Sequence, residues 1–438
     1  MNEIRMLGIR AEDKNHWERR SPLTPDHIAE LGEHSDLRFV VQPSPHRAFP
    51  TLDYTHAGAE IRPSVEDCRI VFGIKEIPVD KIEDNRVYLF FSHTAKGQSH
   101  NMPLLRRLLE SRSTLIDYEY IVDEREKRLI FFGQHAGYAG MINSLWALGK
   151  RFEYEGLTTP FRDIRLAHDY SNLDEATHHI SRVGETLRHN GLEMSQQPIV
   201  CGFTGHGNVS RGAQEVYDRL PTLEIAPEDL ATLVTNDRLS RKTVHKVVFE
   251  RKHRVRRKED GGYDADEFSE HPDRYESRMP EWLPHLTMLC HGSFWSPDQP
   301  RIVSVDDVKS LWSGDAPSLR VIADISCDIG GGIETTVEAT EPGDPVFVYD
   351  PENGGIRHGV EGRGPIMMTV DNLPCQLPVE SSQHFGDTLV RFVPLLARCD
   401  WSRAWSELEL PTSLRNAIIT HRGSLTKPFA FLGEYLDA

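Results

Sequence analysis

Short apolar runs alternate with helical patterns over the first part of the chain. Runs of strand length lie at 7–10, 37–41, 69–74, 87–92 and 114–118. Between two of them, Thr24 and Pro25 supply an N-cap and a proline at the first helical position, and 102–112 also has a helical pattern. Strands that alternate with helices indicate a parallel sheet with helices on both faces. The first part of the chain is therefore predicted to be an α/β lobe.

The same alternation continues through the middle of the chain. Helical patterns cover 136–154 and 175–189, and further apolar runs lie at 198–203, 319–325 and 365–370. The stretch 238–281 is polar and highly charged, which is typical of a solvated loop or surface. The last helical patterns, at 379–397 and 411–419, are expected to fold back on the first lobe.

A chain of 438 residues is too long for a single core, so at least two domains are expected. We predict the α/β class, with two Rossmann-like lobes, each a parallel sheet flanked by helices, and an active-site cleft between them. Residues 1–142 are expected to form a substrate-binding lobe that 375–438 complete. Residues 143–374 are expected to form the dinucleotide-binding lobe.

A glycine-rich turn near mid-chain, between the apolar run 198–203 and a helical pattern, is the main indication of a dinucleotide. Glycines let the backbone approach a pyrophosphate, and the N-terminus of the next helix offers N–H groups to it. The spacing departs from Gly-x-Gly-x-x-Gly, because Ser210 stands where the third glycine would fall. An ordinary tight turn is the alternative that this motif alone leaves open. The residues predicted to contact the cofactor are Gly205, Gly207, Asn208 and Val209.

The apolar run 319–325 leads into a second glycine-rich turn at 326–332. Ligands of open parallel sheets bind beyond the carboxyl ends of the strands, so both turns are expected to face one crevice. The residues of this region predicted to join the cofactor site are Asp324, Ser326, Asp328 and Gly330.

Composition narrows the classes of function. The net charge of −17 argues against a general nucleic-acid binder and against anionic membrane surfaces, and no apolar run approaches the length of a membrane span. The six cysteines are scattered, without a Cys-x-x-Cys pair, and are interpreted as reduced thiols. The N-terminus enters an apparent strand at once, so no signal or transit peptide is expected and the cytoplasm is the predicted location. The 21 histidines show no metal-ligand spacing, so no metal site is predicted.

Charged side chains follow three of the predicted strands of the first lobe. Because the carboxyl ends of parallel strands meet at one edge of a sheet, these groups are expected to converge. A lone lysine is usually solvated and a lone histidine is usually structural, but four cations and a histidine together suit a substrate with several carboxylates. Glu119 follows the next strand and is expected to orient a cation. The clusters are Lys14 with 17–20, which includes Arg20; Lys75 with Glu76; and 92–96, which includes His93 and Lys96.

Several segments together resemble a known family. Residues 12–25, 73–78 and 91–94 resemble the N-terminal domain of the alanine dehydrogenase and transhydrogenase superfamily. Within it, the chain is similar over essentially its whole length to the lysine–2-oxoglutarate reductase domain of the bifunctional aminoadipic semialdehyde synthases. The segments that carry this closer resemblance are 91–94, 132–143, 207–214, 271–275, 323–331, 370–374 and 382–387.

The resemblance implies a reaction and a role for each charged cluster. It implies condensation of the lysine ε-amine with the 2-oxo group of 2-oxoglutarate, followed by hydride reduction of the imine to saccharopine. Lys75 and His93 match the acid–base pair of the related saccharopine dehydrogenases. A separate saccharopine dehydrogenase is an expected partner, whereas nucleic acid and membrane are not. The residues that match or neighbour substrate-binding positions are Lys14, Arg20, Lys96 and, at the base of the cleft, Asp371.

The sequence gives conflicting indications about the nicotinamide cofactor. Glu224 lies about twenty residues after the glycine turn, where an acid holds the ribose 2′-OH and favours NAD(H). The reductase domains prefer NADPH, and Arg251 with its basic neighbours is placed to receive a 2′-phosphate. We predict NADP(H), with NAD(H) as the alternative.

Two other functions stay open at this stage. One is a different enzyme of the superfamily, such as an alanine or other amino-acid dehydrogenase, against which the long segment 238–295 argues. The other is a catalytically inactive nucleotide-binding partner protein, against which the presence of both Lys75 and His93 argues.

Overall fold

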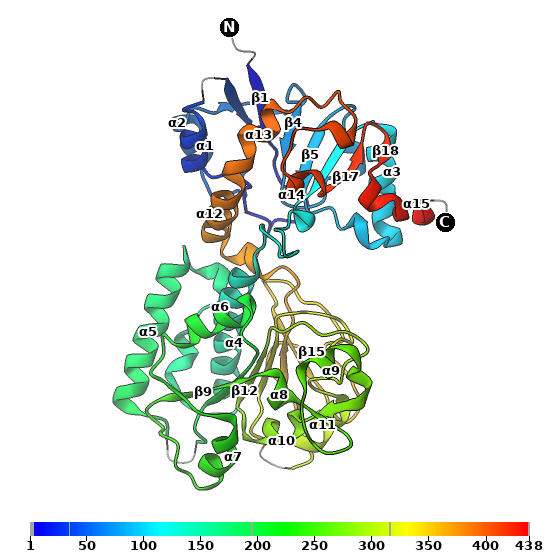
Figure 1. The fold of residues 1–438 in the computed structure, drawn as a ribbon. Coiled ribbons are helices and arrows are strands. Elements are labelled where there is room, and N and C mark those ends of the chain that lie inside the picture. The colour runs from blue at the N-terminus through cyan, green and yellow to red at the C-terminus, as the bar shows by residue number, and fades with distance from the viewer. Residues whose placement is uncertain (1–3, 35, 194–195, 315–316, 437–438) are drawn as a thin grey trace. The chain divides into compact units, whose positions relative to one another are not determined.

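The chain forms two compact units. The computed structural model describes residues 4–34, 36–193, 196–314 and 317–436. The first unit comprises Met1–Phe132 and Pro378–Ala438, and the second comprises Gly133–Leu377. Figure 1 shows the C-terminal segment, in orange and red, together with the blue and cyan elements of the first unit. The first boundary falls before helix α4 (Gly133–Tyr154), whereas the sequence analysis places it after residue 142, inside that helix.

The sheet of the first unit is mostly parallel, in the order β18-β17-β6-β5-β4-β1-β2-β3. All neighbours from β6 to β3 are parallel, and β17 pairs antiparallel with both β6 and β18. Since β1 lies between β2 and β4, the strand order reverses there, and open α/β sheets bind ligands beyond the strand ends at such a point. The bounds are β1 (Arg5–Ile9), β2 (Leu37–Val41), β3 (Glu60–Ile61), β4 (Ile70–Phe72), β5 (Val87–Phe90), β6 (Thr114–Asp117), β17 (Ile418–His421) and β18 (Ser424–Leu425).

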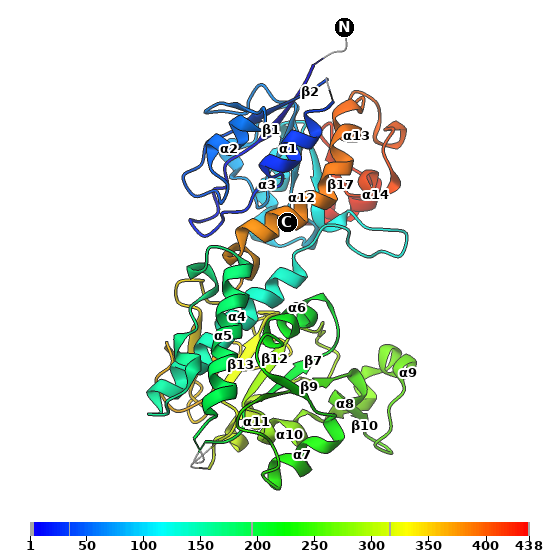
Figure 2. The ribbon, with the colours of Figure 1, turned by 90° about the vertical axis from the view of Figure 1, so that its left-hand side faces the viewer.

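Helices bury both faces of this sheet (Figures 1 and 2). One core joins Ile9 of β1 to Ile28 of α1 and Phe385 of α12, and the other joins Val71 of β4 to Leu105 of α3. Because both faces are covered, the strands are continuous apolar runs rather than alternating ones. The helices are α1 (Pro25–Leu31), α2 (Thr51–His56), α3 (Met102–Glu110), α12 (Pro378–Leu389), α13 (Val393–Arg398), α14 (Thr412–Arg415) and α15 (Gly433–Leu436).

The prediction of a helix over 411–419 is wrong in its second half. Helix α14 covers only Thr412–Arg415, and Ile418–His421 form strand β17, which pairs antiparallel with β6. The β-branched run from Ile418 to Thr420 fits the pleated surface of a sheet edge, and pairing with β6 outweighs any local helical preference. The C-terminal segment Pro378–Ala438 belongs to the first unit.

The second unit has its own eight-stranded sheet, in the order β15-β14-β16-β13-β12-β7-β9-β8. All neighbours from β8 to β16 are parallel, and β14 pairs antiparallel with β16 and β15. The order reverses between β7 and β12, and the predicted α/β class with two helix-flanked sheets is confirmed. The bounds are β7 (Val200–Thr204), β8 (Thr222–Glu224), β9 (Val244–Phe249), β12 (Met288–His291), β13 (Val321–Asp324), β14 (Val346–Tyr349), β15 (Ile356–His358) and β16 (Ile366–Met368), with helices α5 (Leu173–Asn190), α6 (Asn208–Tyr217), α7 (Pro227–Thr235) and α11 (Val305–Leu311).

The interpretation of 238–281 as a solvated loop or surface is wrong for Val244–Phe249, although its basic run includes exposed residues such as Arg251 and Lys252. The segment supplies β9, which is buried along its whole length and pairs with β7. A small insertion follows, whose own core consists of Val255, Phe268 and Tyr275. Its charges pair with one another, which allows so polar a segment to fold. The elements of the insertion are α8 (Arg251–Arg254), β10 (Val255–Arg257), α9 (Ala265–Glu270), β11 (Tyr275–Ser277) and α10 (Met279–Trp282).

Two glycines let α4 and α6 pack backbone against backbone. A Cβ added at Gly137 of α4 would lie 2.1 Å from the carbonyl oxygen of Val209, and one at Gly212 of α6 would lie 2.2 Å from that of Gln134. Gly212 therefore allows close packing of α6 against α4, whereas the third glycine of the usual fingerprint allows close packing of the helix against the strand. Ser210 has another role, because its Oγ donates to the carbonyl of Gly205 at 2.7 Å.

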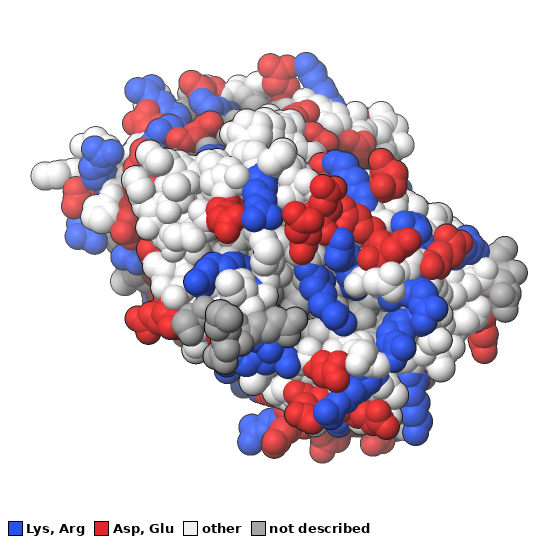
Figure 3. Space-filling view, turned by 90° about the horizontal axis from the view of Figure 1, so that it is seen from above, with Lys and Arg blue, Asp and Glu red and all other residues white. Residues whose placement is uncertain are grey.

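The surface carries charges of both signs. Figure 3 shows Lys and Arg side chains interspersed with Asp and Glu side chains on the face that it displays. A mixed surface of this kind offers no extended basic area for a polyanion on that face. Among the residues that the structure describes, no helix is both long and apolar enough to cross a membrane. All six cysteines are free thiols.

Candidate active site

Four neighbouring strands of the first unit end at one edge of its sheet. β1, β4, β5 and β6 run parallel, so the residues that follow them share that edge. The predicted clusters lie on the loops after these strands, on both sides of the point where the strand order reverses. The fold therefore brings together the loops that carry Lys14 and Arg20, Lys75 and Glu76, His93 and Lys96, and Glu119.

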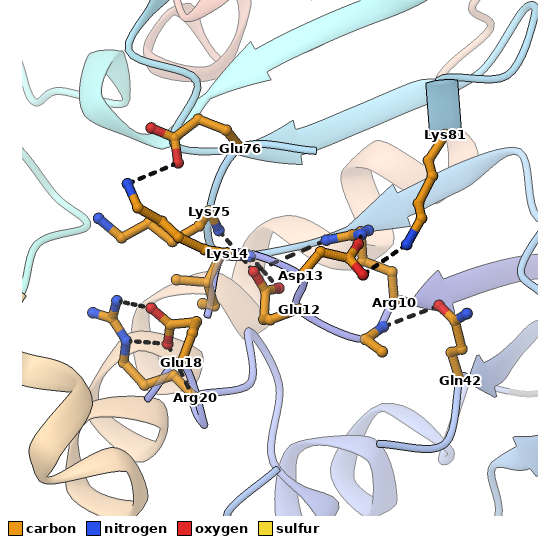
Figure 4. A network of polar contacts seen from close by, with 12 residues as sticks. Arg10, Glu12, Asp13, Lys14, Glu18, Arg20, Gln42, Lys75, Glu76 and Lys81 are labelled. Atoms are coloured by element: carbon orange, nitrogen blue, oxygen red, sulfur yellow. Dashed lines mark hydrogen bonds and ion pairs between the residues drawn. The ribbon is translucent and has the colours of Figure 1, made fainter. Parts of the chain in front are cut away.

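Glu12 is a buried carboxylate that the sequence analysis did not single out. Its Oε1 accepts the N–H of Ile74 at 2.8 Å and its Oε2 accepts the N–H of Lys75 at 3.0 Å. These bonds tie the loop after β1 to the loop after β4 (Figure 4). Burial raises the pKa of Glu12, and the Arg10 guanidinium, 4.0 Å away, opposes that effect. The available signal was its place directly after the first strand, where the strand order reverses.

The ammonium group of Lys75 lies among other charges. The residue is half-buried, and its Nζ makes no hydrogen bond or ion pair with any residue that the structure describes. Burial lowers the pKa of Lys75, and the positive charges of Arg20 and Lys14 lower it further, against the opposing carboxylates of Glu18 and Glu76. Figure 4 shows these side chains gathered at the same edge. Lys75 therefore loses its proton, and becomes a neutral amine, at a lower pH than an ordinary lysine does.

A carboxylate holds the imidazole of His93. The Nδ1 atom of His93 lies 2.5 Å from Oε1 of Glu76, whose Oε2 lies 3.4 Å from Nζ of Lys14. Burial alone would raise the pKa of Glu76, but the hydrogen bond and charge of His93, helped by the charge of Lys14, hold it at about 2. A carboxylate on Nδ1 fixes the ring and places the proton of the neutral imidazole there, which leaves Nε2 for a ligand.

The backbone turn that presents His93 is fixed by a second buried acid, Asp117. His93 has φ 52 and ψ 16, in the left-handed region that non-glycine residues rarely adopt. Next to it, the N–H and Oγ of Ser92 donate to Oδ2 of Asp117 at 3.0 and 2.5 Å. Burial raises the pKa of Asp117, and the Ser92 hydrogen bonds oppose that effect. Asp117 was not predicted as a site residue, although this residue ends β6, the strand beside the one that leads to His93.

Arg20 and Lys96 differ in how far the protein already engages them. Arg20 is buried, and its Nε and Nη2 donate to the two oxygens of Glu18 at 2.8 and 2.5 Å. Its guanidinium carbon also lies 4.3 Å from the centre of the Phe132 ring. Lys96 is exposed and has no ion-pair partner among the described residues. Arg20 is thus held in one orientation, whereas Lys96 is available to an incoming carboxylate.

Two other residues expected at the substrate site lie in different surroundings. Glu119 forms an ion pair with Arg128, and its N–H donates to Oδ1 of Asp117 at 2.9 Å. Asp371 is exposed and belongs to the second unit, so the fold of the first unit does not bring it to Lys75 and His93. Both substrate-binding roles remain predictions.

In the second unit, the first glycine turn has the geometry of a phosphate cradle. Gly205 has φ +73, and its N–H donates to the carbonyl of Phe249 at 2.9 Å. Gly207 is the N-cap of α6, and Asn208 and Val209 form the first turn of that helix. A Cβ at Gly207 would meet no atom within 4 Å, so the space beside the N-terminus of α6 is open. This arrangement fits the phosphates of a dinucleotide.

The second glycine turn is shaped by its own side chains. The buried carboxylate of Asp324 accepts from Oγ of Ser326 and from Oγ1 of Thr336, each at 2.6 Å. Burial raises the pKa of Asp324, and these hydrogen bonds oppose that effect. Asp328 and Gly330 are exposed, and Gly330 has φ +63. Asp324 and Ser326 thus hold the turn in shape, while Asp328 and Gly330 lie on its surface.

The strand order changes which acid stands beside the first glycine turn. Glu224 ends β8, which is the edge strand, and its carboxylate lies 3.4 Å from Nζ of Lys246. The strand adjacent to β7 is β9, and Glu250 and Arg251 follow it directly. Glu250, not Glu224, therefore occupies the place of the ribose acid in a dinucleotide fold. Arg251 is exposed beside it, with its guanidinium carbon 5.4 Å from the centre of the Phe268 ring and no carboxylate partner among the described residues.

The glycine turns, the strand-order reversals and the sequence Glu250–Arg251 directly after β9 define a dinucleotide-binding protein of the doubly wound α/β type. No group of three or more His, Cys, Asp or Glu side chains within the described ranges is arranged to hold a metal ion. Two family models match the chain: "Alanine dehydrogenase/PNT, N-terminal domain" over residues 8–139 and "Alanine dehydrogenase/PNT, C-terminal domain" over residues 296–428. The chain belongs to the alanine dehydrogenase/PNT family, as the resemblance implied.

Individual relatives agree with this assignment. The chain is 36% identical over 447 residues to "Alpha-aminoadipic semialdehyde synthase, mitochondrial" of Mus musculus, which covers 99% of this chain and 48% of that protein. It is 37% identical over 444 residues to "Alpha-aminoadipic semialdehyde synthase" of Arabidopsis thaliana, which covers 98% of this chain and 41% of that protein. The chain therefore spans about half the length of these relatives. A solved L-alanine dehydrogenase has the same fold, with a TM-score of 0.63 at 18% identity, covering 98% of this chain and 99% of that one.

Proposed function

We propose that this chain is a lysine–2-oxoglutarate reductase, which condenses L-lysine with 2-oxoglutarate and reduces the imine with NADPH to saccharopine. The similarity to two aminoadipic semialdehyde synthases over nearly the whole chain supports this proposal. The observation that carries it is the presence, on neighbouring loops at one sheet edge, of Lys75, whose pKa is lowered and whose Nζ has no partner among the described residues, and of His93, whose Nδ1 is held by Glu76. Such a pair suits a reaction that both removes and delivers protons.

The cations of the first unit suit the charge of these substrates. 2-Oxoglutarate brings two carboxylates and lysine brings a third. Lys96 has no ion-pair partner among the described residues, so it can bind a carboxylate without breaking an existing pair. We assign Lys14 and Arg20 to carboxylate binding as well, because their charges reach the ammonium group of Lys75.

Proton transfer in the condensation follows from the two side chains. The ε-amine of the substrate lysine attacks the 2-oxo carbon only after losing a proton, and neutral Lys75 is a suitable acceptor. The oxygen of the resulting carbinolamine leaves as water when it gains a proton, which His93 can deliver from Nε2 when both of its ring nitrogens carry protons. The C–N bond is thereby formed and the C–O bond is broken. Lys75 then returns its proton to His93 through the site or solvent, so the number of protons on the enzyme does not change.

The second unit has the residues to hold the cofactor. Gly205, Gly207 and the first turn of α6 would hold the pyrophosphate, and Arg251 would meet a 2′-phosphate. When bound, NADPH supplies the hydride that reduces the imine. The absence of a carboxylate partner for Arg251 among the described residues favours NADPH over NADH.

The compartment and the partner remain predictions. Six free thiols agree with a reducing compartment such as the cytoplasm, although the Mus musculus relative is named as mitochondrial. A separate saccharopine dehydrogenase is the enzyme class that would consume the product.

The test is a substrate-pair assay of NADPH oxidation. We expect oxidation only when L-lysine and 2-oxoglutarate are both present, with saccharopine as the product detected by mass spectrometry. Pyruvate with ammonia is the matched control for the amino-acid dehydrogenase alternative. Equal turnover with ammonia in place of lysine would reject the reductase in favour of that alternative, and no turnover with either pair would favour an inactive nucleotide-binding protein.

A further inference from the structure

Most cations of the insertion after β9 are neutralised by nearby carboxylates. Arg256 pairs with Glu276 and Glu281, each at 2.7 Å, and Arg257 pairs with Glu267 at 2.7 Å. The remaining Lys or Arg pairs of this kind are Lys252 with Glu250, Arg257 also with Asp260, Arg274 with Glu267, and Arg278 with Glu281. Five cations of the insertion are therefore paired with acids, whereas Arg251, Arg254 and Lys258 have no ion pair with any residue that the structure describes.

Arg254 is the exception that is buried. The residue is 9% exposed, and it has no carboxylate partner among the residues that the structure describes. Its Nη1 donates to Oγ of Ser293 at 2.7 Å, and its Nε is buried with no hydrogen-bond partner within the described ranges. A buried guanidinium that lacks both a counter-ion and one of its hydrogen bonds is energetically unfavourable.

A second cation, Arg251, further destabilises the buried charge of Arg254. The positive charge of Arg251 reaches Arg254, and burial together with that charge lowers the pKa of Arg254 to about 10. Arg251 itself lies over Phe268 and has no carboxylate partner in the described ranges. Two neighbouring guanidinium groups without an anion repel each other, and a bound dianion would remove that repulsion.

The two arginines stand at the edge of the sheet that holds the glycine turn. Helix α8 follows β9, which pairs with β7, and Ser293 follows β12, which pairs with β7 on the other side. A Cβ at Gly205 would lie 3.7 Å from Cβ of Ser293, so the hydrogen bond from Arg254 reaches the neighbourhood of the turn. The main chain of α8 is anchored, because Trp282 Nε1 donates to the carbonyl of His253 at 2.8 Å.

We infer that Arg254, anchored by Ser293, is the buried half of a two-arginine site that binds a phosphate monoester of the dinucleotide, with Arg251 as its exposed half. This inference rests on the proposed binding of NADP(H). The 2′-phosphate is the expected occupant, since α8 follows the strand adjacent to β7, where dinucleotide folds place the 2′ side of the adenosine ribose. The pyrophosphate is the other phosphate within the same ligand, and the experiment distinguishes the two.

The test uses fragments of the cofactor and needs no turnover. Binding of 2′,5′-ADP, 5′-ADP and 5′-AMP is measured by titration calorimetry on the full chain and on Arg254→Met. We expect a ten- to hundredfold loss of affinity for 2′,5′-ADP, about what one charge-assisted contact contributes, and nearly unchanged affinity for 5′-ADP and 5′-AMP. Equal losses for 2′,5′-ADP and 5′-ADP would assign the site to the pyrophosphate. Unchanged affinity for both would overturn the proposal.

Stability of the ligand-free protein separates a binding role from a structural one. Because Arg254 is buried without a counter-ion, we expect Arg254→Met to raise the thermal midpoint of the ligand-free chain and to reduce its stabilisation by 2′,5′-ADP. A lower midpoint with full stabilisation by 2′,5′-ADP would make Arg254 a structural residue and overturn the proposal.

Two further variants complete the design. Arg254→Lys keeps the charge but loses the planar fork, and it should lose about tenfold in affinity for 2′,5′-ADP, even if the methionine variant fails to fold. Lys258→Gln is the matched control, because Lys258 belongs to the same basic run and its Nζ donates to the carbonyl of Asp273. Since these measurements use adenosine fragments alone, they give an answer even if the chain shows no reductase activity.

Discussion

The two sheets end in opposite electrostatic situations. At the edge of the first sheet, two of the four cations assigned to the site already have carboxylate partners, Arg20 in Glu18 and Lys14 in Glu76. At the edge of the second sheet, Arg251 and Arg254 have none among the described residues. The first edge is therefore organised before a ligand arrives, whereas the second lacks an anion. This difference is expected between a site that must set the protonation of side chains and a site that must bind a polyanion.

The largest expected effect comes from removing the acid–base pair of the first unit. Lys75→Met and His93→Ala should each lower kcat by ~10²–10⁴-fold, because a positioned proton donor or acceptor is lost. The dissociation constant for NADPH should hardly change in either variant, since the glycine turns belong to the second unit. Steady-state kinetics and nucleotide titration give the two numbers. Lys81→Met is the control, because Lys81 is exposed and pairs with Asp13 instead. Near-normal rates in both variants would make this edge structural.

A variant of the second unit is expected to change cofactor affinity. Arg251→Ala should raise the KM for NADPH by about ten- to hundredfold and leave that for NADH almost unchanged, because only NADPH carries the 2′-dianion. Arg256→Ala is a fair control, since its guanidinium is occupied by Glu276 and Glu281. If both cofactors respond alike, Arg251 is part of a solvated surface.

A smaller effect tests which acid faces the ribose. We expect Glu250→Ala to weaken NADH relative to NADPH by roughly three- to tenfold, through loss of hydrogen bonds to the 2′-OH and of repulsion toward a 2′-phosphate. Glu224→Ala should leave the ratio unchanged, because Glu224 ends the edge strand beside Lys246. The ratio of kcat/KM for the two cofactors is the measurement. If the ratio changes only in Glu224→Ala, Glu224 is the acid that faces the ribose, as the count of residues from the glycine turn predicted.

The smallest expected effect is a shift along the pH axis. The positive charge of Lys14 contributes to lowering the pKa of Lys75, so Lys14→Gln should move that pKa upward, toward its ordinary value. The neutral, proton-accepting form of Lys75 would then require a higher pH, and the acid limb of the kcat profile should move to higher pH. Lys81→Gln should leave the limb in place, because Lys81 is not among the charges that act on Lys75. A limb that stays fixed in Lys14→Gln, or moves to lower pH, contradicts this account.

Local patterns predicted much of the first unit. Thr24 and Pro25 marked the start of α1, and the run 37–41 is strand β2 residue for residue. The rule that parallel strands end at one edge placed Lys75 and His93 on neighbouring loops, as the structure has them. Glu12 and Asp117 were beyond such patterns, because their carboxylates accept backbone N–H groups from distant loops. No local spacing encodes that role.

The second unit was harder to predict for topological reasons. β9 contains His245 and Lys246 within a strongly charged stretch, so its buried character was hidden until the strand was seen beside β7. The extra edge strand β8 also lengthens the chain between the glycine turn and the strand next to it. A count of residues from the glycine turn therefore selects Glu224, whereas the acid that follows β9, the strand next to β7, is Glu250.

The open space at Gly207 has a consequence for how this protein tolerates change. At Gly137 and Gly212 an added methyl group would strike backbone atoms, so the fold itself rejects the substitution. At Gly207 an added methyl group would meet nothing, and its φ of −68 suits any residue. Alanine there would pass every test of folding and still occupy the space beside the N-terminus of α6. Cellular quality control responds to unfolded chains and would not detect this change. Selection could act against the substitution only through the weaker binding of the ligand.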